Sequence, residues 1–262
     1  MLSKWIAHSR ISEENEINLI CFTYPGGSAS NFATWKKLID SKINLVPILY
    51  PERELRKKDT MQENIDIFVQ ELVEENKEIF SGKYAFFGYC GGAILAYEAC
   101  LKAKELYNSE PVYGLIASSE EPKFLGDSLV VFPEELGDAK EDIVAHLSSL
   151  GIFDESVLRN DTFLSYYLPM LKADCRLLDT YKPKEYVKLN CDLDVLYGTQ
   201  DTTVKKEKVV GWSDTTNGAT RVEGVDAGHF FVDPMKEYVC DIINNNLLDL
   251  SQEGEVLVEE IW

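Results

Sequence analysis

Short apolar runs recur along the chain and are separated by longer segments in which apolar and polar residues mix. The runs predict strands at residues 17–22, 44–49, 84–87, 112–117, 194–197 and 220–225. The segments between them have a helical pattern, so strands and helices alternate for most of the chain. This alternation predicts a mainly parallel sheet flanked by helices, the α/β class.

The clearest helix start lies after the second predicted strand. Thr60 and Glu63 have the spacing of a capping box, and Ile65, Phe68 and Leu72 follow at helical spacing. We therefore expect a helix that begins at Thr60.

The alternation breaks between the fourth and fifth predicted strands. From about residue 123 to 181 the strand pattern disappears and the sequence becomes helical. An insertion at this place predicts a lid over an active site, with ordinary packing of helices on the core as the alternative. At 262 residues and 45% hydrophobic, the chain can bury a full core. We expect one domain over residues 1–262 with a lid insertion at about 123–181.

The candidate nucleophile stands directly after the third predicted strand. Residues 88–92 read Gly-Tyr-Cys-Gly-Gly, which is the glycine spacing of a nucleophile elbow with Cys90 where serine is usual. The elbow needs small neighbours because its nucleophile sits on a strained turn between a strand and a helix. A glycine-rich turn around a buried cysteine is the alternative, since free cysteines are often buried.

An acid and a histidine follow in the order of a catalytic triad. Asp201 stands just past the fifth predicted strand, and His229 lies in a glycine-containing loop before the C-terminal helix. Nucleophile, acid and histidine in this chain order are typical of α/β-hydrolases. Together they predict acyl transfer: Cys90 attacks a carbonyl, His229 moves protons and Asp201 orients the imidazole. The backbone N–H of Gly91 and a donor from the loop at residues 23–28 would bind the oxyanion.

Four motifs in order resemble the type II, or editing, thioesterases of nonribosomal peptide and polyketide assembly. They lie at residues 23–28, 51–56, 168–174 and 227–231, so the resemblance covers nearly the whole chain. It implies an α/β-hydrolase that cleaves acyl groups from the phosphopantetheine arm of an acyl or peptidyl carrier protein. Cys90, Asp201 and His229 match the triad positions of that family.

The chain departs from the family at two places besides the nucleophile. The family's oxyanion donor in the first loop aligns with Pro25, which has no N–H, so Gly26 is the expected substitute. Glu120 follows the fourth predicted strand, where some assembly-line thioesterases keep the triad acid. Glu120 is therefore a rival to Asp201.

The cysteine widens the range of expected reactions. An acyl group on Cys90 remains a thioester, so it can be hydrolysed or passed to an amine or thiol, including amide or lactam release. A non-catalytic homologue that only binds carrier protein, with Cys90 as a redox sensor or a remnant, is another alternative.

Other side chains are expected to meet the substrate or its carrier. Tyr24, Tyr89, Phe230 and Tyr167 are candidates for substrate binding. Arg53 and Arg56 belong to the densest basic cluster and follow a predicted strand end, which makes them candidates for carrier docking. A solvated loop is the alternative for these two arginines.

Charge and cysteine usage limit the partners. A net charge of −19 argues against nucleic acid or an anionic membrane as the main partner. The six cysteines form no CxxC pair, which favours a reducing cytoplasm, and the scattered histidines predict no metal site. We expect a cytoplasmic monomer without a cofactor of its own, since phosphopantetheine arrives on the carrier.

Overall fold

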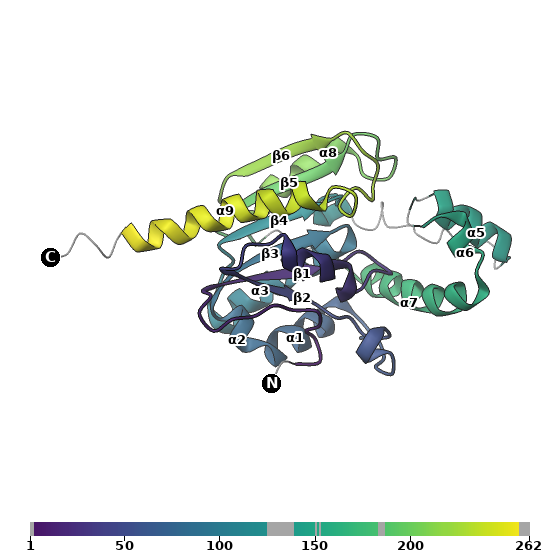
Figure 1. Cartoon of the computed structure of the whole chain (residues 1–262), viewed down its shortest axis with the longest axis horizontal. Helices are drawn as coiled ribbons and strands as arrows, with labels where there is room; N and C mark the ends of the chain where they lie inside the picture. Colours follow the sequence, from purple (N-terminus) through teal and green to yellow (C-terminus); the bar gives the residue numbers. More distant parts are fainter. Residues whose placement is uncertain (1–2, 125–138, 150, 152, 183–186, 257–262) are drawn as a thin grey trace.

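A parallel sheet forms the centre of the computed structural model, which describes residues 3–124, 139–149, 151, 153–182 and 187–256. Its strands are β1 (Ile17–Phe22), β2 (Ile43–Pro47), β3 (Lys83–Tyr89), β4 (Tyr113–Ala117), β5 (Asp192–Gly198) and β6 (Thr220–Val225). They are ordered β2-β1-β3-β4-β5-β6, and every pair of neighbours is parallel (Figure 1). The predicted α/β class and parallel sheet are confirmed.

Helices connect the strands. The α-helices are α1 (Ile65–Glu75), α2 (Lys77–Phe80), α3 (Gly91–Tyr107), α5 (Lys140–Ser149), α6 (Glu155–Leu158), α7 (Asp161–Asp179), α8 (Lys206–Val209) and α9 (Lys236–Val256). Short 3₁₀ turns are η1 (Ala29–Lys37), η2 (Glu54–Arg56), η3 (Pro122–Phe124) and η4 (Val210–Thr215). Among the described residues, no helix is long and apolar enough to cross a membrane.

The start of α1 differs from the prediction. The helix begins at Ile65, and Asn64 caps it by accepting a hydrogen bond of 2.9 Å from the Ile67 N–H. The expected start at Thr60 is wrong. The side chain of Asn64, and not that of Thr60, accepts the hydrogen bond from a free N–H of the first helical turn.

The sheet is covered on both faces, because successive side chains of a strand point to opposite sides. Ile20 and Phe22 of β1 pack with α1 and α3 on one face, whereas Leu19 and Cys21 pack with η1 and α9 on the other. All six cysteines are free thiols, and Cys90 is half-buried while the other five are buried.

The strand register gathers the loops that carry the predicted site. Phe22 pairs with Gly88, so the loop after β1 begins beside the turn after β3. Ala117 pairs with both Tyr89 and Leu196, which brings the ends of β3, β4 and β5 to the same edge. Parallel strands place their carboxyl ends together, which is where such sheets bind ligands.

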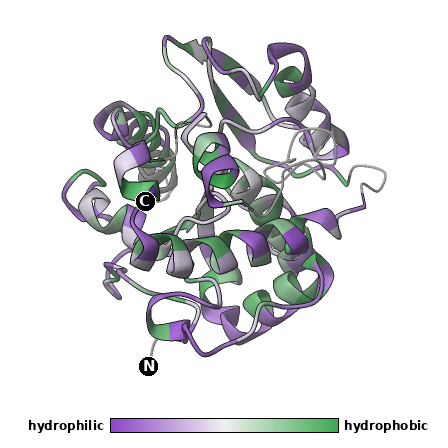
Figure 2. Cartoon of the chain, turned by 90° about the vertical axis from the view of Figure 1, so that its right-hand side faces the viewer, coloured by the Kyte–Doolittle hydropathy of each residue, from purple (hydrophilic) through white to green (hydrophobic). Residues whose placement is uncertain are grey.

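The helices α5, α6 and α7 lie between β4 and β5 in the chain and gather beyond one end of the sheet (Figure 1). They share a small hydrophobic core that includes Val144, Leu158 and Leu171. Figure 2 views the molecule from this end and shows helices with a hydrophobic and a hydrophilic side. Residues 125–138 of the expected lid lie outside the described part of the chain.

Candidate active site

Cys90 occupies a strained turn between β3 and α3. Its backbone has φ 54° and ψ −127°, and residues other than glycine rarely adopt a positive φ. A Cβ on Gly88 would lie 2.5 Å from the Ala93 Cα, and one on Gly92 would lie 2.3 Å from the Thr23 carbonyl oxygen. Only glycine fits at both places, so the two glycines allow the tight elbow that presents the thiol.

His229 and Asp201 meet at the same edge of the sheet. The Nδ1 atom of His229 lies 2.7 Å from Oδ2 of Asp201, whose side chain is fully buried. The other carboxylate oxygen accepts the N–H groups of Thr203 and Val204 at 2.7 and 3.1 Å. Burial raises the pKa of Asp201, but the hydrogen bond and charge of His229 and these two N–H groups lower it below its usual value. Asp201 is thus held as a carboxylate that orients the imidazole.

The imidazole of His229 faces the thiol of Cys90. Burial would lower the pKa of His229, yet the negative charge of Cys90 and the hydrogen bonds to Asp201 and Cys90 raise it to about 10. Because Nδ1 is bound to Asp201, Nε2 is the nitrogen left for the sulfur. The raised pKa favours a protonated His229 imidazole near neutral pH.

Two hydroxyl groups hold the backbone of His229 in place. The Ser118 hydroxyl donates to the His229 carbonyl at 2.7 Å, and the Tyr89 hydroxyl donates to the same oxygen at 3.3 Å. Ser118 was not among the site residues expected from the sequence. Its place directly after β4 was the available signal, because that end of the strand adjoins the elbow.

The aromatic residues expected at the site cluster beside His229. The ring of Phe230 lies 5.2 Å from that of Tyr24 and 6.0 Å from that of Tyr89, in edge-to-face contacts. The His229 ring contacts Phe230 at 4.7 Å. Tyr24, Tyr89 and Phe230 therefore form one aromatic wall next to the triad.

Tyr167 comes from α7 and is 2% exposed. It packs against Phe153 and Phe163 of the α5–α7 core, and a Cβ on Gly26 would lie 2.5 Å from its hydroxyl. Tyr167 therefore reaches the first-loop residue Gly26 from the helical insertion.

Only one of the two expected oxyanion donors is free among the described residues. Gly91 is the first residue of α3, so its N–H lacks a partner within the helix. The Gly26 N–H instead donates to Oδ2 of Asp174 at 2.7 Å. The prediction of Gly26 as the second oxyanion donor is therefore wrong, because its N–H already donates to a buried carboxylate.

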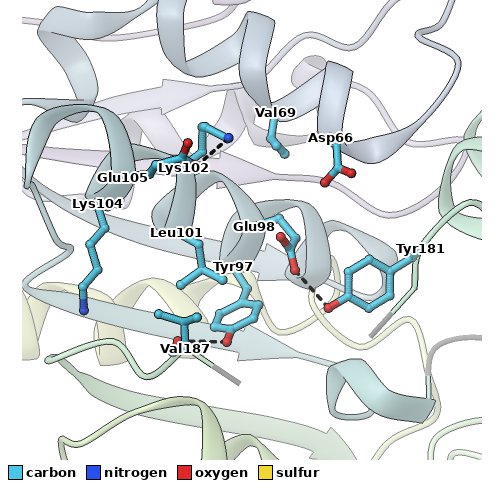
Figure 3. A pocket seen from close by; sticks show the side chains of 10 residues that line it. All are labelled: Asp66, Val69, Tyr97, Glu98, Leu101, Lys102, Lys104, Glu105, Tyr181 and Val187. Atoms are coloured by element: carbon cyan, nitrogen blue, oxygen red, sulfur yellow. Dashed lines mark hydrogen bonds and ion pairs between the residues drawn. The ribbon is translucent and has the colours of Figure 1, made fainter. Parts of the chain in front are cut away.

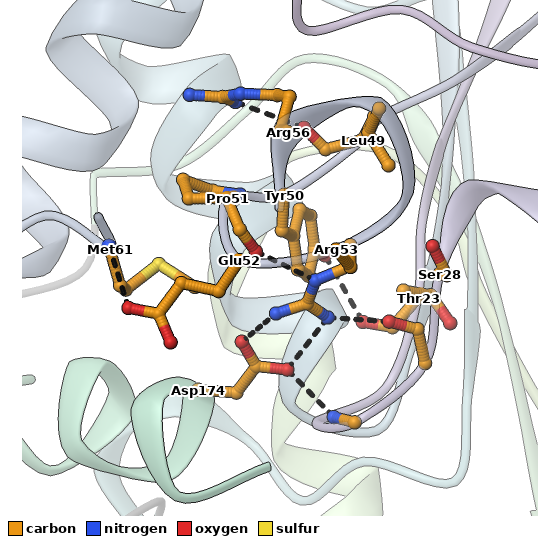
Figure 4. A network of polar contacts seen from close by, with 12 residues as sticks. Thr23, Ser28, Leu49, Tyr50, Pro51, Glu52, Arg53, Arg56, Met61 and Asp174 are labelled. Atoms are coloured by element: carbon orange, nitrogen blue, oxygen red, sulfur yellow. Dashed lines mark hydrogen bonds and ion pairs between the residues drawn. The ribbon is translucent and has the colours of Figure 1, made fainter. Parts of the chain in front are cut away.

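The proposed docking role of Arg53 and Arg56 is also wrong, because both side chains are buried. Arg53 is 0% exposed and binds both carboxylate oxygens of Asp174, and it also donates to the Gly27 carbonyl (Figure 4). Arg56 is 3% exposed, donates to the Leu49 carbonyl and pairs with Asp59 at 2.8 Å. Neither guanidinium faces solvent, so a carrier protein has no access to them.

Glu120 does not replace Asp201 as the triad acid. It is 3% exposed, its Oε1 accepts the Lys205 N–H at 3.2 Å, and its Oε2 lies 3.2 Å from Nζ of Lys208. The structure therefore joins Asp201, and not Glu120, to His229.

A pocket of about 330 Å³ lies away from the triad, between α1 and α3 (Figure 3). Both of its tyrosine hydroxyl groups are engaged: that of Tyr181 donates to Glu98 at 2.9 Å, and that of Tyr97 donates to the Val187 carbonyl at 3.0 Å. Within the described ranges, no three histidine, cysteine or acidic side chains gather as a metal site would require.

The parallel sheet, the elbow and the acid–histidine pair define an α/β-hydrolase fold. Solved structures agree: the type II thioesterase BorB from the borrelidin biosynthetic cluster aligns with a TM-score of 0.78 at 24% identity, covering 93% of this chain and 97% of that one. ClbQ from the colibactin NRPS/PKS pathway aligns with a TM-score of 0.79 at 24% identity, covering 90% and 99%.

The sequence comparisons show the family. The thioesterase domain model matches residues 17–247, and the chain belongs to this family. It is 25% identical to thioesterase PikA5 of Streptomyces venezuelae over 93% of this chain and 85% of that protein. It is 24% identical to the gramicidin S biosynthesis protein GrsT of Aneurinibacillus migulanus, over 91% and 93%.

Proposed function

We propose that this protein is a type II thioesterase that hydrolyses acyl groups from the phosphopantetheine arm of carrier proteins in nonribosomal peptide or polyketide assembly. The observation that carries the proposal is the site itself: a thiol on a positive-φ elbow faces an imidazole whose Nδ1 lies 2.7 Å from a buried carboxylate. Membership of the thioesterase family and similarity to PikA5 and GrsT support the substrate class.

The reaction begins with attack by the Cys90 thiolate on the thioester carbonyl. A bond forms between sulfur and carbon, and the π electrons of the carbonyl move to its oxygen, where the Gly91 N–H stabilises the charge. Collapse of this intermediate breaks the bond to the pantetheine sulfur. The departing sulfur takes the proton of the His229 imidazolium and leaves as a thiol.

Hydrolysis completes the cycle. Neutral His229 accepts a proton from a water molecule as that water attacks the acyl-cysteine carbonyl. The second tetrahedral intermediate collapses to a carboxylic acid and the Cys90 thiolate, and His229 is left protonated. Asp201 keeps Nδ1 of the imidazole bound through both halves of the reaction.

The helices α5–α7 act in this proposal as a lid. The face of α7 that carries Tyr167, Asp174 and Leu178 lies against Gly26 and Gly91, next to the expected oxyanion site. The aromatic wall of Tyr24, Tyr89 and Phe230, together with Tyr167, is the proposed boundary of the acyl site.

Acyl transfer is the second candidate function, and the sulfur of Cys90 favours it. An acyl-cysteine is itself a thioester, so an amine or thiol that enters the site can accept the acyl group in place of water. The product is then an amide, a lactam or a new thioester.

Intact-mass spectrometry tests the proposal. The wild type and Cys90→Ala are mixed with acyl-phosphopantetheinyl carrier protein, and acyl-enzyme and products are followed over time. A free acid that depends on Cys90 supports hydrolysis. An acyl-enzyme that persists in water but clears when an amine is added supports transfer. No adduct and no product with a panel of acyl groups would favour a protein that only binds carriers.

A further inference from the structure

The oxyanion site lacks the usual second backbone donor. In the first loop, Pro25 has no N–H. The next amide, that of Gly26, donates to Asp174 at 2.7 Å, and Arg53 binds both oxygens of the same carboxylate (Figure 4). Because Asp174 is 3% exposed and is held by Arg53, the Gly26 N–H cannot turn to a substrate without giving up a hydrogen bond to a buried carboxylate.

A buried hydroxyl without a partner lies at the same place. Tyr167 is 2% exposed, and its hydroxyl has no hydrogen-bond partner among the described residues. A Cβ built on Gly26 would lie 2.5 Å from this hydroxyl oxygen, so the hydroxyl lies directly against the loop. A buried hydroxyl without a partner is unfavourable in the free protein, which indicates a role that is fulfilled when a ligand is present.

The loop residues on either side of the Tyr167 contact adjoin the site. The Pro25 ring adjoins Gly91, because a Cβ on Gly91 would lie 3.1 Å from the Pro25 Cγ. On the other side, Tyr24 belongs to the aromatic wall beside His229. Burial first, and then the proximity of Tyr24 and Asp174, raise the pKa of Tyr167 well above its ordinary value, so the hydroxyl remains a donor at any working pH.

We propose that the Tyr167 hydroxyl donates the second hydrogen bond to the carbonyl oxygen of the thioester as Cys90 attacks it. In this role it replaces the amide that Pro25 cannot supply and that Asp174 withholds at Gly26. Tyr167 keeps its proton throughout: the oxyanion accepts hydrogen bonds from Gly91 N–H and Tyr167 O–H, and then the carbonyl reforms. The inference rests on the proposed function, since it needs an acyl substrate on Cys90.

Because Tyr167 belongs to α7, this donor arrives from the helical insertion and not from the sheet. A complete oxyanion site therefore requires α7 to lie against the first loop. The contact of Leu178 with Gly91, where a Cβ would lie 2.4 Å from the Leu178 Cδ1, extends the same helix face across the site.

The variant Tyr167→Phe removes only the hydroxyl. With octanoyl-N-acetylcysteamine as the probe, we expect the rate constant for acylation of Cys90 to fall about 100-fold, as for the loss of one oxyanion donor. Alkylation of Cys90 by iodoacetamide should keep its wild-type rate, because the thiolate displaces iodide at the CH2 carbon and no oxyanion forms. The thermal midpoint should stay the same or rise, because the lost hydroxyl had no partner.

A matched control and a rescue sharpen the test. Tyr166→Phe removes a hydroxyl from the next residue of α7, which is 50% exposed, and should leave acylation unchanged. Pro25→Ala restores an N–H to the loop, so the double variant Pro25→Ala/Tyr167→Phe should recover at least tenfold over Tyr167→Phe, as an added donor would.

Four results would overturn the inference. If Tyr167→Phe is acylated at the wild-type rate, the hydroxyl takes no part in the reaction. If acylation and alkylation fall equally, the hydroxyl only supports the structure. If Pro25→Ala/Tyr167→Phe acylates no faster than Tyr167→Phe, the Tyr167 hydroxyl does not stand in for the amide that Pro25 lacks. If the wild type itself forms no acyl-Cys90 from this probe or from acyl carrier protein, the proposed function fails and this inference fails with it.

Discussion

Arg53 and Asp174 form a buried ion pair although they lie 121 positions apart in the chain. The Arg53 guanidinium binds both carboxylate oxygens, one of them at 2.9 Å, and the exposed fractions of the two side chains are 0% and 4%. Asp174 lies on α7, whereas Arg53 lies next to η2 and donates to the Gly27 carbonyl. The pair thus joins the helical insertion to the first loop of the site.

Removing one partner of this pair should be costly. Arg53→Met leaves the Asp174 carboxylate buried without its counter-ion, so we expect the free energy of unfolding to fall by about 3–5 kcal/mol. Urea denaturation measured by circular dichroism checks this value. Arg159→Met is the matched control, because Arg159 and its partner Glu155 are 57% and 53% exposed, and its loss should cost at most about 1 kcal/mol. Equal costs for both variants would mean that the buried pair contributes no more than a surface pair.

The same pair explains why part of the site could be predicted from the sequence and part could not. Cys90, Asp201 and His229 are each marked locally, by glycine spacing and by the strand end or loop that precedes them. The burial of Arg53 depends on a helix far away in the chain, and no local pattern shows that a basic cluster will be covered. The prediction of Gly26 as an oxyanion donor failed for the same reason, because its N–H donates to Asp174 on that distant helix. The position of α7 was the missing information.

The thiolate–imidazolium pair of the proposed mechanism should appear in the titration of His229. The pKa of His229 is raised to about 10, from 6.5, and the negative charge of Cys90 is the largest of the raising causes. In ¹⁵N NMR of histidine-labelled protein we expect the His229 ring to remain doubly protonated at pH 8, and to titrate at lower pH in Cys90→Ala. The stabilisation from protonated His229 should be complete below pH 6.5 and lost as the pH rises through about 10.

The other two histidines, His8 and His146, provide internal controls in the same spectra, and His229→Gln assigns the signal. A His229 ring that is neutral at pH 8 in the wild type, or one that titrates identically in Cys90→Ala, would contradict the thiolate–imidazolium pair.

The choice of sulfur should decide the fate of the acyl group. Cys90→Ser converts the intermediate into an oxygen ester, which is lower in energy than a thioester and a weaker acyl donor to amines. With octanoyl carrier protein and benzylamine, we expect the ratio of amide to free acid to be at least about tenfold lower for Cys90→Ser than for the wild type. Liquid chromatography with mass detection measures both products.

Cys90→Ala serves as the blank for this experiment, since any amide it yields comes from direct reaction of the amine with the substrate. Similar ratios for the cysteine and serine proteins would show that the sulfur does not control the partition between water and amine, and hydrolysis alone would then describe the protein.

The elbow should tolerate no added carbon at Gly92. A Cβ there would lie 2.3 Å from the Thr23 carbonyl oxygen, which is backbone held between β1 and the first loop and cannot rotate away. Gly92→Ala must therefore push α3 from the loop, and we expect a loss of more than about 3 kcal/mol in unfolding free energy together with loss of acylation.

Gly82→Ala is the matched control for Gly92→Ala. The atom nearest to a Cβ on Gly82 is the Glu78 carbonyl oxygen, at 3.7 Å. Because alanine also restricts the unfolded chain, that variant should be unchanged or more stable by up to about 1 kcal/mol. A Gly92→Ala protein with wild-type stability and acylation would mean that the first loop and α3 are not packed as closely as the elbow geometry requires.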